Sequence, residues 1–231
     1  MNIFGLQKLS LLDFPGKMAC TVFTGGCNLR CPFCHNASLV TGLSEVEPIA
    51  EQEVFDLLKK RRGILEGVAI TGGEPLLQPD MEDFIRRVRA QGYAVKLDTN
   101  GCFPDHLSRI LSEGLVDYVA MDIKNAPESY AKTVGVEGFD LSPVQKSIDL
   151  LMNGEVDYEF RTTVVKELHS AADFEQIGRW LKGAKRLYLQ AFKDSGDLIG
   201  GGFSAYAPAQ MQQFRSLLLP FIPNTFLRGV D

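Results

Sequence analysis

The chain is predicted to be an α/β protein that folds as a partial (β/α)6 barrel, similar to an incomplete TIM barrel. Short apolar, β-branched segments alternate with longer amphipathic ones along its 231 residues, an order typical of parallel βα units. A complete eightfold barrel usually takes about 250 residues, so an open barrel of six strands fits this length better. We expect a single domain over residues 1–231, with a lead-in segment at 1–17 and the barrel and its tail at 18–231.

Each strand is assigned from a short apolar or β-branched run, and each helix from apolar residues spaced three or four apart. The predicted strands cover residues 18–24, 67–71, 94–98, 118–124, 158–164 and 187–192, with a short further strand at 225–228. The predicted helices cover residues 50–61, 81–90, 104–112, 142–152, 171–181 and 208–219. Because strands and helices alternate, consecutive strands should be parallel neighbours in one sheet.

The composition is that of an ordinary globular protein, with 45% hydrophobic residues, 23% charged residues and a net charge of −5. The dense basic run at residues 59–62 suits the end of a helix better than a nucleic-acid surface. No stretch approaches the roughly 20 apolar residues of a membrane span, and the N-terminus lacks the pattern of a signal peptide. We therefore expect a cytoplasmic protein that binds neither nucleic acid nor a membrane.

Reactive residues follow four successive predicted strands. In parallel βα folds the carboxyl ends of the strands lie at one edge and carry the reactive groups. The segments at these ends are the cysteine loop at residues 27–34, Gly72-Gly73-Glu74-Pro75, Asp98-Thr99-Asn100-Gly101, and Asp122 with Lys124. We expect them to converge on one site.

Cys27, Cys31 and Cys34 form a C-x3-C-x2-C motif with no fourth cysteine nearby. An iron–sulfur cube normally takes four cysteine thiolates, so three thiolates would leave one iron open to a substrate or cofactor. The alternative is a structural zinc site, which needs four ligands. His35 could be the fourth ligand, but its position next to Cys34 suits the same tetrahedron poorly. The motif therefore favours an open iron–sulfur cluster.

Cys20, Cys102 and the Gly200-Gly201-Gly202 loop have roles that the sequence leaves open. Either cysteine could complete a metal site, although a buried thiol that packs as a small hydrophobe is the simpler interpretation. The five cysteines, an odd number with three of them inside eight residues, do not resemble a disulfide framework and favour a reducing compartment. The glycine loop could be a lid or a docking loop, but a simple linker is the plainer reading.

The Gly-Gly-Glu-Pro turn could bind a ligand, because glycines let a ligand approach the backbone closely. Either an exposed Glu74 or the local carbonyls of Gly72 and Gly73 could hold an ammonium group. The alternative is a plain connection between a strand and a helix.

Side chains alternate along a strand, so Asp122 and Lys124 should point into the barrel. Buried charges need partners or a polar ligand, and a mutual ion pair is the alternative to a ligand site. On the next strand Arg161 shares a face with Glu159. Arg161 could bind a ligand carboxylate or pair with Glu159, and the sequence does not decide between the two.

The cysteine motif, with an aromatic residue before its last cysteine, and the Gly-Gly-Glu-Pro turn resemble the radical S-adenosylmethionine (SAM) superfamily. The resemblance implies a radical SAM core in which Cys27, Cys31 and Cys34 bind a [4Fe-4S] cluster, whose open iron chelates the amino and carboxyl groups of SAM. It implies that Phe33 lies near the adenine and that the turn at residues 72–75 contacts the methionyl ammonium.

Within this superfamily the chain is similar to the enzymes that activate glycyl radical enzymes. The similarity rests on Asp13-Phe14-Pro15-Gly16, Cys34-His35-Asn36, Asp98-Thr99-Asn100-Gly101 and Asp122-Ile123-Lys124. It implies that Asp122 and Lys124 help to hold the cofactor and the reactive site, and that Arg161 approaches the cofactor carboxylate. Asp98 and Asp122 could also hold a monovalent cation. Gln190 stands where some activases carry a histidine, which leaves its role open.

The resemblance implies that a flavodoxin or ferredoxin supplies one electron, which cleaves SAM to methionine and a 5′-deoxyadenosyl radical. That radical would take hydrogen from a glycine of a partner glycyl radical enzyme, and anaerobic ribonucleoside-triphosphate reductase is the expected partner. The few cysteines predict a single cluster. Two alternatives remain: a radical SAM enzyme acting on a small molecule, such as the 7-carboxy-7-deazaguanine synthases, and a non-enzymatic zinc-binding module.

Overall fold

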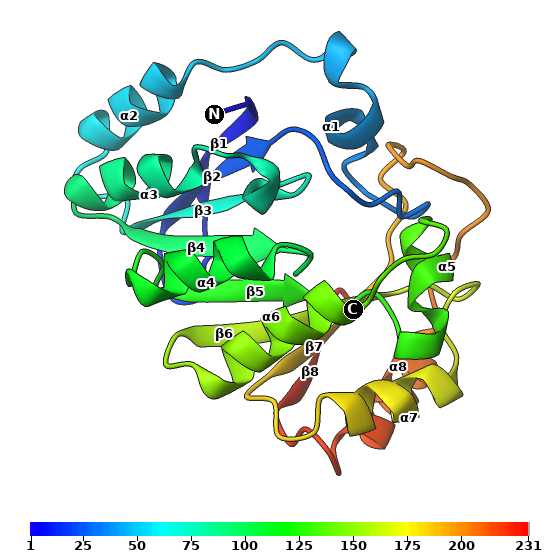
Figure 1. The fold of residues 1–231 in the computed structure, drawn as a ribbon. Helices are drawn as coiled ribbons and strands as arrows, with labels where there is room; N and C mark the ends of the chain where they lie inside the picture. The colour runs from blue at the N-terminus through cyan, green and yellow to red at the C-terminus, as the bar shows by residue number, and fades with distance from the viewer. Residues whose placement is uncertain (231) are drawn as a thin grey trace.

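The computed structural model describes residues 1–230, and its centre is one eight-stranded sheet in which neighbours in sequence are neighbours in space. The first pair of strands is antiparallel and every later pair is parallel. The strands are β1 (Ile3–Ser10), β2 (Ala19–Thr24), β3 (Gly67–Gly72), β4 (Ala94–Thr99), β5 (Tyr118–Asp122), β6 (Asp157–Val164), β7 (Leu187–Ala191) and β8 (Thr225–Arg228). Within the described residues no ladder joins β8 to β1, so the predicted open barrel is confirmed (Figure 1).

The helices alternate with the parallel strands and pack on one face of the sheet, as Figure 1 shows for α3, α4 and α6. The longer ones are α2 (Glu51–Lys60), α3 (Met81–Ala90), α4 (Pro104–Ser112), α6 (Ser142–Asn153), α7 (Ala171–Trp180) and α8 (Pro208–Leu218). The short ones are α1 (Ala37–Thr41), α5 (Tyr130–Val134) and the 3-10 turns η1 (Leu43–Glu45), η2 (Pro75–Leu77) and η3 (Pro127–Ser129). All six predicted helices are present, with ends that differ by at most one residue.

The two faces of the sheet bury different residues, and β5 shows the division. Val119 and Met121 belong to the large apolar core beneath the helices. Tyr118 and Ala120 alternate with them and lie in a separate small cluster inside the barrel. This is the alternation that the sequence predicts. It leaves the inner face free to carry polar groups at the carboxyl ends of the strands.

The region before the barrel holds the main element that the sequence did not reveal. Residues 1–17, expected to be a lead-in, contain β1, whose pairing with β2 has two register irregularities. Such interruptions break the strict alternation by which strands are found in a sequence. Strand β5 ends at Asp122, so Lys124, which the prediction placed inside the strand, lies just beyond its end.

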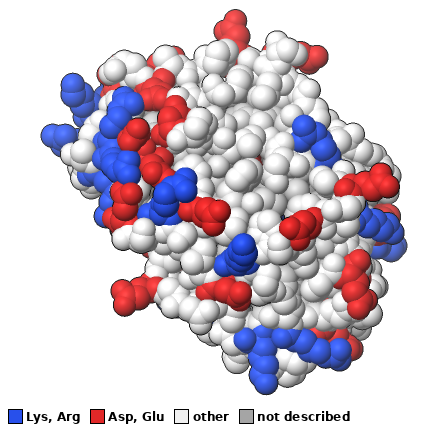
Figure 2. Space-filling view, viewed as in Figure 1, with Lys and Arg blue, Asp and Glu red and all other residues white. Residues whose placement is uncertain are grey.

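The surface carries charges of both signs. Figure 2 shows basic and acidic side chains interspersed where α2 and α3 lie. They include the ion pairs of Arg87 with Glu51 and of Arg86 with Asp83, at 2.5 and 2.7 Å. Among the described residues, no helix combines the length and the apolar character needed to cross a bilayer.

Candidate active site at the carboxyl ends of the strands

A cavity of about 440 Å³ lies at the carboxyl ends of the parallel strands, and each strand from β1 to β7 contributes to its wall. All the predicted site residues except Glu74 line it. They are Cys27, Cys31, Phe33, Cys34, Gly72, Gly73, Asp98, Asp122, Lys124, Arg161 and Gln190. The expected convergence of the strand ends is therefore present in the structure.

The cysteine loop follows β2 and is held in place by backbone contacts. The Gly26 N–H donates to the Leu39 carbonyl at 2.8 Å, and the Cys34 N–H donates to the Cys31 carbonyl at 3.0 Å. The Cys27 sulfur accepts a hydrogen bond from the Leu29 N–H at 3.4 Å. Burial raises the pKa of Cys31 to about 12, so the free thiol stays protonated. A bound metal would favour the thiolate, because metal binding displaces the thiol proton.

Cys27, Cys31 and Cys34 line the same cavity. Within residues 1–230 no three His, Cys, Asp or Glu side chains could hold a single metal ion together. A cubane cluster makes a different demand, since each thiolate binds its own iron atom. Cys20 is fully buried in β2, and neither Cys20 nor Cys102 lines the cavity. The residues present therefore fit a cluster held by three cysteines.

The turn after β3 packs so closely on the cysteine loop that it requires glycine. Gly72 has a φ of +118°, and a Cβ there would stand 2.3 Å from the Thr24 carbonyl oxygen. A Cβ on Gly73 would stand 2.0 Å from the Gly26 carbonyl oxygen. The Glu74 N–H donates to that same carbonyl at 2.8 Å. The glycines thus fasten the turn to the loop that carries the cysteines.

Glu74 is not exposed, and this corrects the expectation of an exposed carboxylate at the cavity. It is completely buried, and both carboxylate oxygens accept hydrogen bonds. Oε1 accepts from the Leu76 N–H at 3.1 Å and the Thr99 hydroxyl at 2.8 Å, and Oε2 accepts from the Asn100 N–H at 2.7 Å. Burial raises the pKa of Glu74 to about 7 against these three donors. The carboxylate joins the ends of β3 and β4, and the backbone carbonyls remain as the ammonium-binding alternative.

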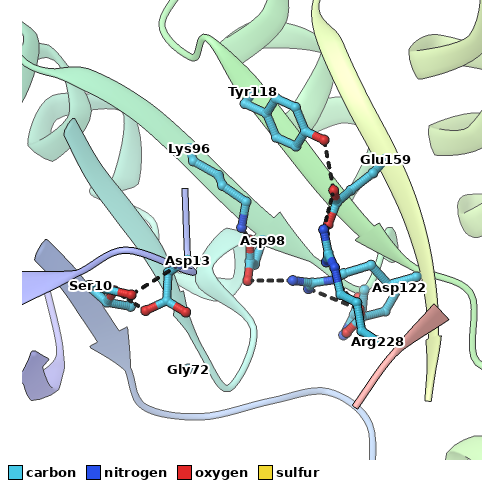
Figure 3. A network of polar contacts seen from close by, with 12 residues as sticks. Ser10, Asp13, Gly72, Lys96, Asp98, Tyr118, Asp122, Glu159 and Arg228 are labelled. Carbon is cyan, nitrogen blue, oxygen red and sulfur yellow. Dashed lines mark hydrogen bonds and ion pairs between the residues drawn. The ribbon is translucent and has the colours of Figure 1, made fainter. Parts of the chain in front are cut away.

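Five charged side chains form a network of ion pairs beside the cavity, and all of them except Lys96 line its wall. The Lys96 ammonium contacts Asp98, and the Arg161 guanidinium contacts Asp98 at 2.9 Å and Asp122 at 3.0 Å. At the other end of the network, the Lys124 ammonium pairs with Asp122 at 2.9 Å. Figure 3 shows Lys96 directed at Asp98, with Asp122 on the adjacent strand. The mutual pair of Asp122 and Lys124 is therefore real, but it belongs to a larger network.

This network carries one excess positive charge. Burial alone would raise the pKa of Asp122, but Arg161 and Lys124 overcome that effect and lower it to about 2. Burial likewise would raise the pKa of Asp98, and Arg161 and Lys96 lower it. Both carboxylates are ionised, so three cations face two anions. A ligand carboxylate in the cavity would balance the remaining charge.

Several residues of the cavity wall were not singled out as site residues from the sequence. Asp13 follows β1 and accepts a hydrogen bond from the Thr21 hydroxyl at 2.5 Å, while its own N–H donates to Ser10 (Figure 3). Asn100 donates to Asn28 at 2.8 Å and to the Cys27 sulfur at 3.7 Å. Asp13 and Asn100 both lie in segments on which the resemblance rests, which is the signal that could have marked them.

The glycine-containing loop after β7 packs against the cysteine loop. The Gly200 N–H donates to the Pro32 carbonyl at 2.7 Å, and Asp197 accepts from the Ser38 hydroxyl at 2.8 Å. His35 stacks on Phe192 at a centroid distance of 5.4 Å. These contacts bring the end of the sheet near the metal-ligand candidates, so the loop does more than connect β7 with α8.

A model of the Radical SAM superfamily matches residues 21–181 of the chain. A Methanocaldococcus jannaschii protein, named only provisionally as a glycyl-radical enzyme activating enzyme, is 28% identical over 235 residues, covering 99% of this chain and 96% of its own length. The pyruvate formate-lyase-activating enzyme of Clostridium pasteurianum is 33% identical over 148 residues, or 60% of either chain. The 7-carboxy-7-deazaguanine synthase of Methanopyrus kandleri is 32% identical over 130 residues, covering 48% of this chain and 51% of the synthase.

Among solved structures, Streptococcus suis SuiB bound to its precursor peptide SuiA has a similar fold. The TM-score is 0.72 at 13% sequence identity, and the match covers 90% of this chain and 48% of SuiB. At this identity the likeness concerns the fold alone. It confirms the α/β architecture and the open barrel.

Proposed function

Because the chain belongs to the radical SAM superfamily, we propose that it is an activase that generates the radical of a partner glycyl radical enzyme. Members of this superfamily use a [4Fe-4S] cluster and SAM. The observation that carries the proposal is the alignment with the M. jannaschii activating-enzyme relative, which extends over nearly the whole of both chains. The match to the synthase covers only about half of each chain.

The cofactors supply the radical chemistry: when both are bound, one electron cleaves SAM to methionine and a 5′-deoxyadenosyl radical. The chain's own residues would bind and orient them. Cys27, Cys31 and Cys34 would hold three irons of the cluster, because these thiols line one cavity. Phe33 is buried in the wall of that cavity and would contact the adenine.

Arg161 and Lys124 would bind the carboxylate of SAM, because the network that they belong to has one excess positive charge. Asp122 orients both cations through its ion pairs. The backbone carbonyls of Gly72 and Gly73 would accept the methionyl ammonium, and Glu74 would act indirectly by holding their turn.

Two expectations about the cavity wall remain proposals. Gln190 lines the cavity and would contact SAM in the position where some activases carry a histidine. The monovalent cation expected beside Asp98 and Asp122 would have to share these carboxylates with Arg161, which bridges them in the structure.

The substrate would be one glycine of a protein partner, with anaerobic ribonucleoside-triphosphate reductase as the specific candidate. Glycine has no side chain to obstruct the approach of its α-hydrogen to the radical. A flavodoxin or ferredoxin would supply the electron. The Asp13-Phe14-Pro15-Gly16 segment and the Asp122 and Lys124 pair favour this activity over that of the synthase, whose small-molecule substrate is the second candidate.

The cluster assignment is tested with Cys31→Ala and the matched control Cys20→Ala. Cys20 is also buried but lies in β2 away from the cavity. After anaerobic reconstitution, Cys31→Ala should lose iron and sulfide and produce no 5′-deoxyadenosine from SAM. Cys20→Ala should retain both cluster and cleavage. Full cleavage by Cys31→Ala would refute the assignment.

The partner assignment is tested by oxygen-free incubation with SAM, a reductant and candidate glycyl radical enzymes. Electron paramagnetic resonance should show a glycine-centred signal with the true partner and none when the target glycine is replaced by alanine. Product formation from a pterin-like compound, without any glycine-centred signal, would instead support the small-molecule alternative.

A further inference from the structure

The Arg161 side chain does not pair with Glu159, the carboxylate on the same face of its own strand. Glu159 and Arg161 are two residues apart on the same face of β6, so their side chains start roughly 7 Å apart. Burial would lower the pKa of Arg161, but Asp122, Asp98 and Glu159 together raise it. Glu159 therefore attracts Arg161, yet the guanidinium contacts Asp98 and Asp122 and not Glu159.

Both oxygens of Glu159 are already paired with another arginine. The carboxylate is 1% exposed, and its two oxygens accept from the two terminal nitrogens of Arg228 at 2.7 and 2.9 Å. The Tyr118 hydroxyl donates a third hydrogen bond at 2.8 Å. Figure 3 shows Arg228 and Tyr118 reaching the Glu159 carboxylate from different sides. This forked pairing is the strongest geometry that an arginine and a carboxylate can adopt.

Arg228 lies on β8, and its side chain extends past β7 to reach Glu159 on β6. It lies on β8 in register with Gln190 of β7, and its guanidinium stacks on the Tyr188 ring at 3.5 Å. Stacking on an aromatic face fixes the guanidinium plane. The C-terminal strand thereby supplies a counter-charge to β6 from two strands away.

We infer that Arg228 is a positioning residue: by occupying Glu159, it leaves Arg161 free to face the ligand carboxylate in the cavity. Arg228 does not itself line that cavity. Without Arg228, the buried Glu159 carboxylate would be left with Tyr118 alone and would draw Arg161 back along β6. That the ligand is SAM rests on the proposed function. That Arg228 controls the position of the Arg161 side chain does not depend on it.

The test is a double-mutant cycle with R228Q, E159Q and R228Q/E159Q, in which SAM binding to anaerobically reconstituted protein is measured by calorimetry. R228Q should weaken SAM binding about tenfold, as for one lost charge-assisted contact. E159Q alone should leave the affinity within about threefold of wild type, because Arg161 keeps its partners. The double variant should recover wild-type affinity, since Glu159 no longer competes for Arg161.

A merely structural role for Arg228 would give a different pattern, in which the double variant binds SAM no better than R228Q. That result would overturn the inference, as would wild-type affinity in R228Q. A crystal structure of R228Q without cofactors provides a second readout. Arg161 should have moved to Glu159, and an Arg161 that still contacts Asp98 and Asp122 would also overturn the inference.

If R228Q does not fold, R228K replaces it, because lysine keeps a cation beside Glu159 but cannot form the forked pair. Its smaller loss of affinity should again disappear on adding E159Q, and a loss that persists would contradict the inference.

Failure of the wild-type protein to bind SAM would refute the proposed function. The position of Arg161 in the R228Q crystal would then still decide the structural part.

Discussion

The turn after β3 and the end of β5 each place a carboxylate beside the same cavity, Glu74 fully buried and Asp122 partly exposed, and each carboxylate has different partners. Glu74 in the turn accepts only from neutral donors, two backbone N–H groups and the Thr99 hydroxyl. Asp122 at the end of β5 lies between two cations, Arg161 and Lys124. Accordingly, burial raises the pKa of Glu74 to about 7, whereas the cations overcome burial at Asp122 and lower its pKa to about 2.

Glu74 therefore holds parts of the polypeptide together, whereas Asp122 is placed to position the groups that bind a ligand. The three donors to Glu74 belong to its own turn and to the end of β4, and Glu74 does not line the cavity. Asp122 does line the cavity, and its partners retain hydrogen-bonding capacity for a ligand because both cations have further N–H donors. Replacing Glu74 should therefore affect folding most, and replacing Asp122 should affect binding most.

The largest effect is expected from Glu74→Ala. The substitution leaves the Leu76 N–H, the Asn100 N–H and the Thr99 hydroxyl buried without an acceptor, and should lower the free energy of unfolding by about 3 kcal/mol. Urea denaturation of the cofactor-free protein measures this loss. Glu74→Gln keeps one acceptor oxygen and should lose less. If Glu74→Ala were as stable as wild type, the turn would not depend on this carboxylate.

Asp122→Asn should have its main effect on the ligand. Removing one negative charge frees Arg161 and Lys124 from their shared anchor, and SAM affinity should fall about tenfold. Calorimetry on reconstituted protein measures the affinity, and Asp105→Asn, which alters an exposed carboxylate on α4, serves as the control. A loss of stability without any loss of affinity would erase the distinction between the two regions.

The smallest effect is a pH dependence of stability whose sign differs between the two carboxylates. The pKa of Glu74 is raised on folding, so the folded state binds more protons near neutrality, and stability should decrease by about 1 kcal/mol between pH 6 and pH 8. The pKa of Asp122 is lowered to about 2, so its contribution is present at neutral pH and is lost only as the pH falls from about 4 towards 2. Urea titrations of wild type and Glu74→Gln between pH 6 and pH 8 should differ in slope. Parallel curves would contradict the raised pKa.

Much of the architecture can be predicted from the sequence because it depends on the pattern of neighbouring residues. The alternation of strands and helices predicts six parallel strands, and the period of two along β5 predicts which side chains face inward. Strand β1 was missed because its register irregularities interrupt that period. The positions of Cys27, Cys31 and Cys34 at the end of β2 follow from the same local order.

The sequence by itself determined the strand ends, the cysteine spacing and the residues that gather at one edge of the sheet, because short-range periodicity dictates these features. The tertiary structure alone decided which charges meet. Glu74 turned inward to neutral donors from the next strand, and Arg161 turned to Asp98 and Asp122 because Arg228, 67 residues later in the chain, holds Glu159. Ion pairs and hydrogen bonds between distant segments depend on geometry in space, and spacing along the chain carries no record of it.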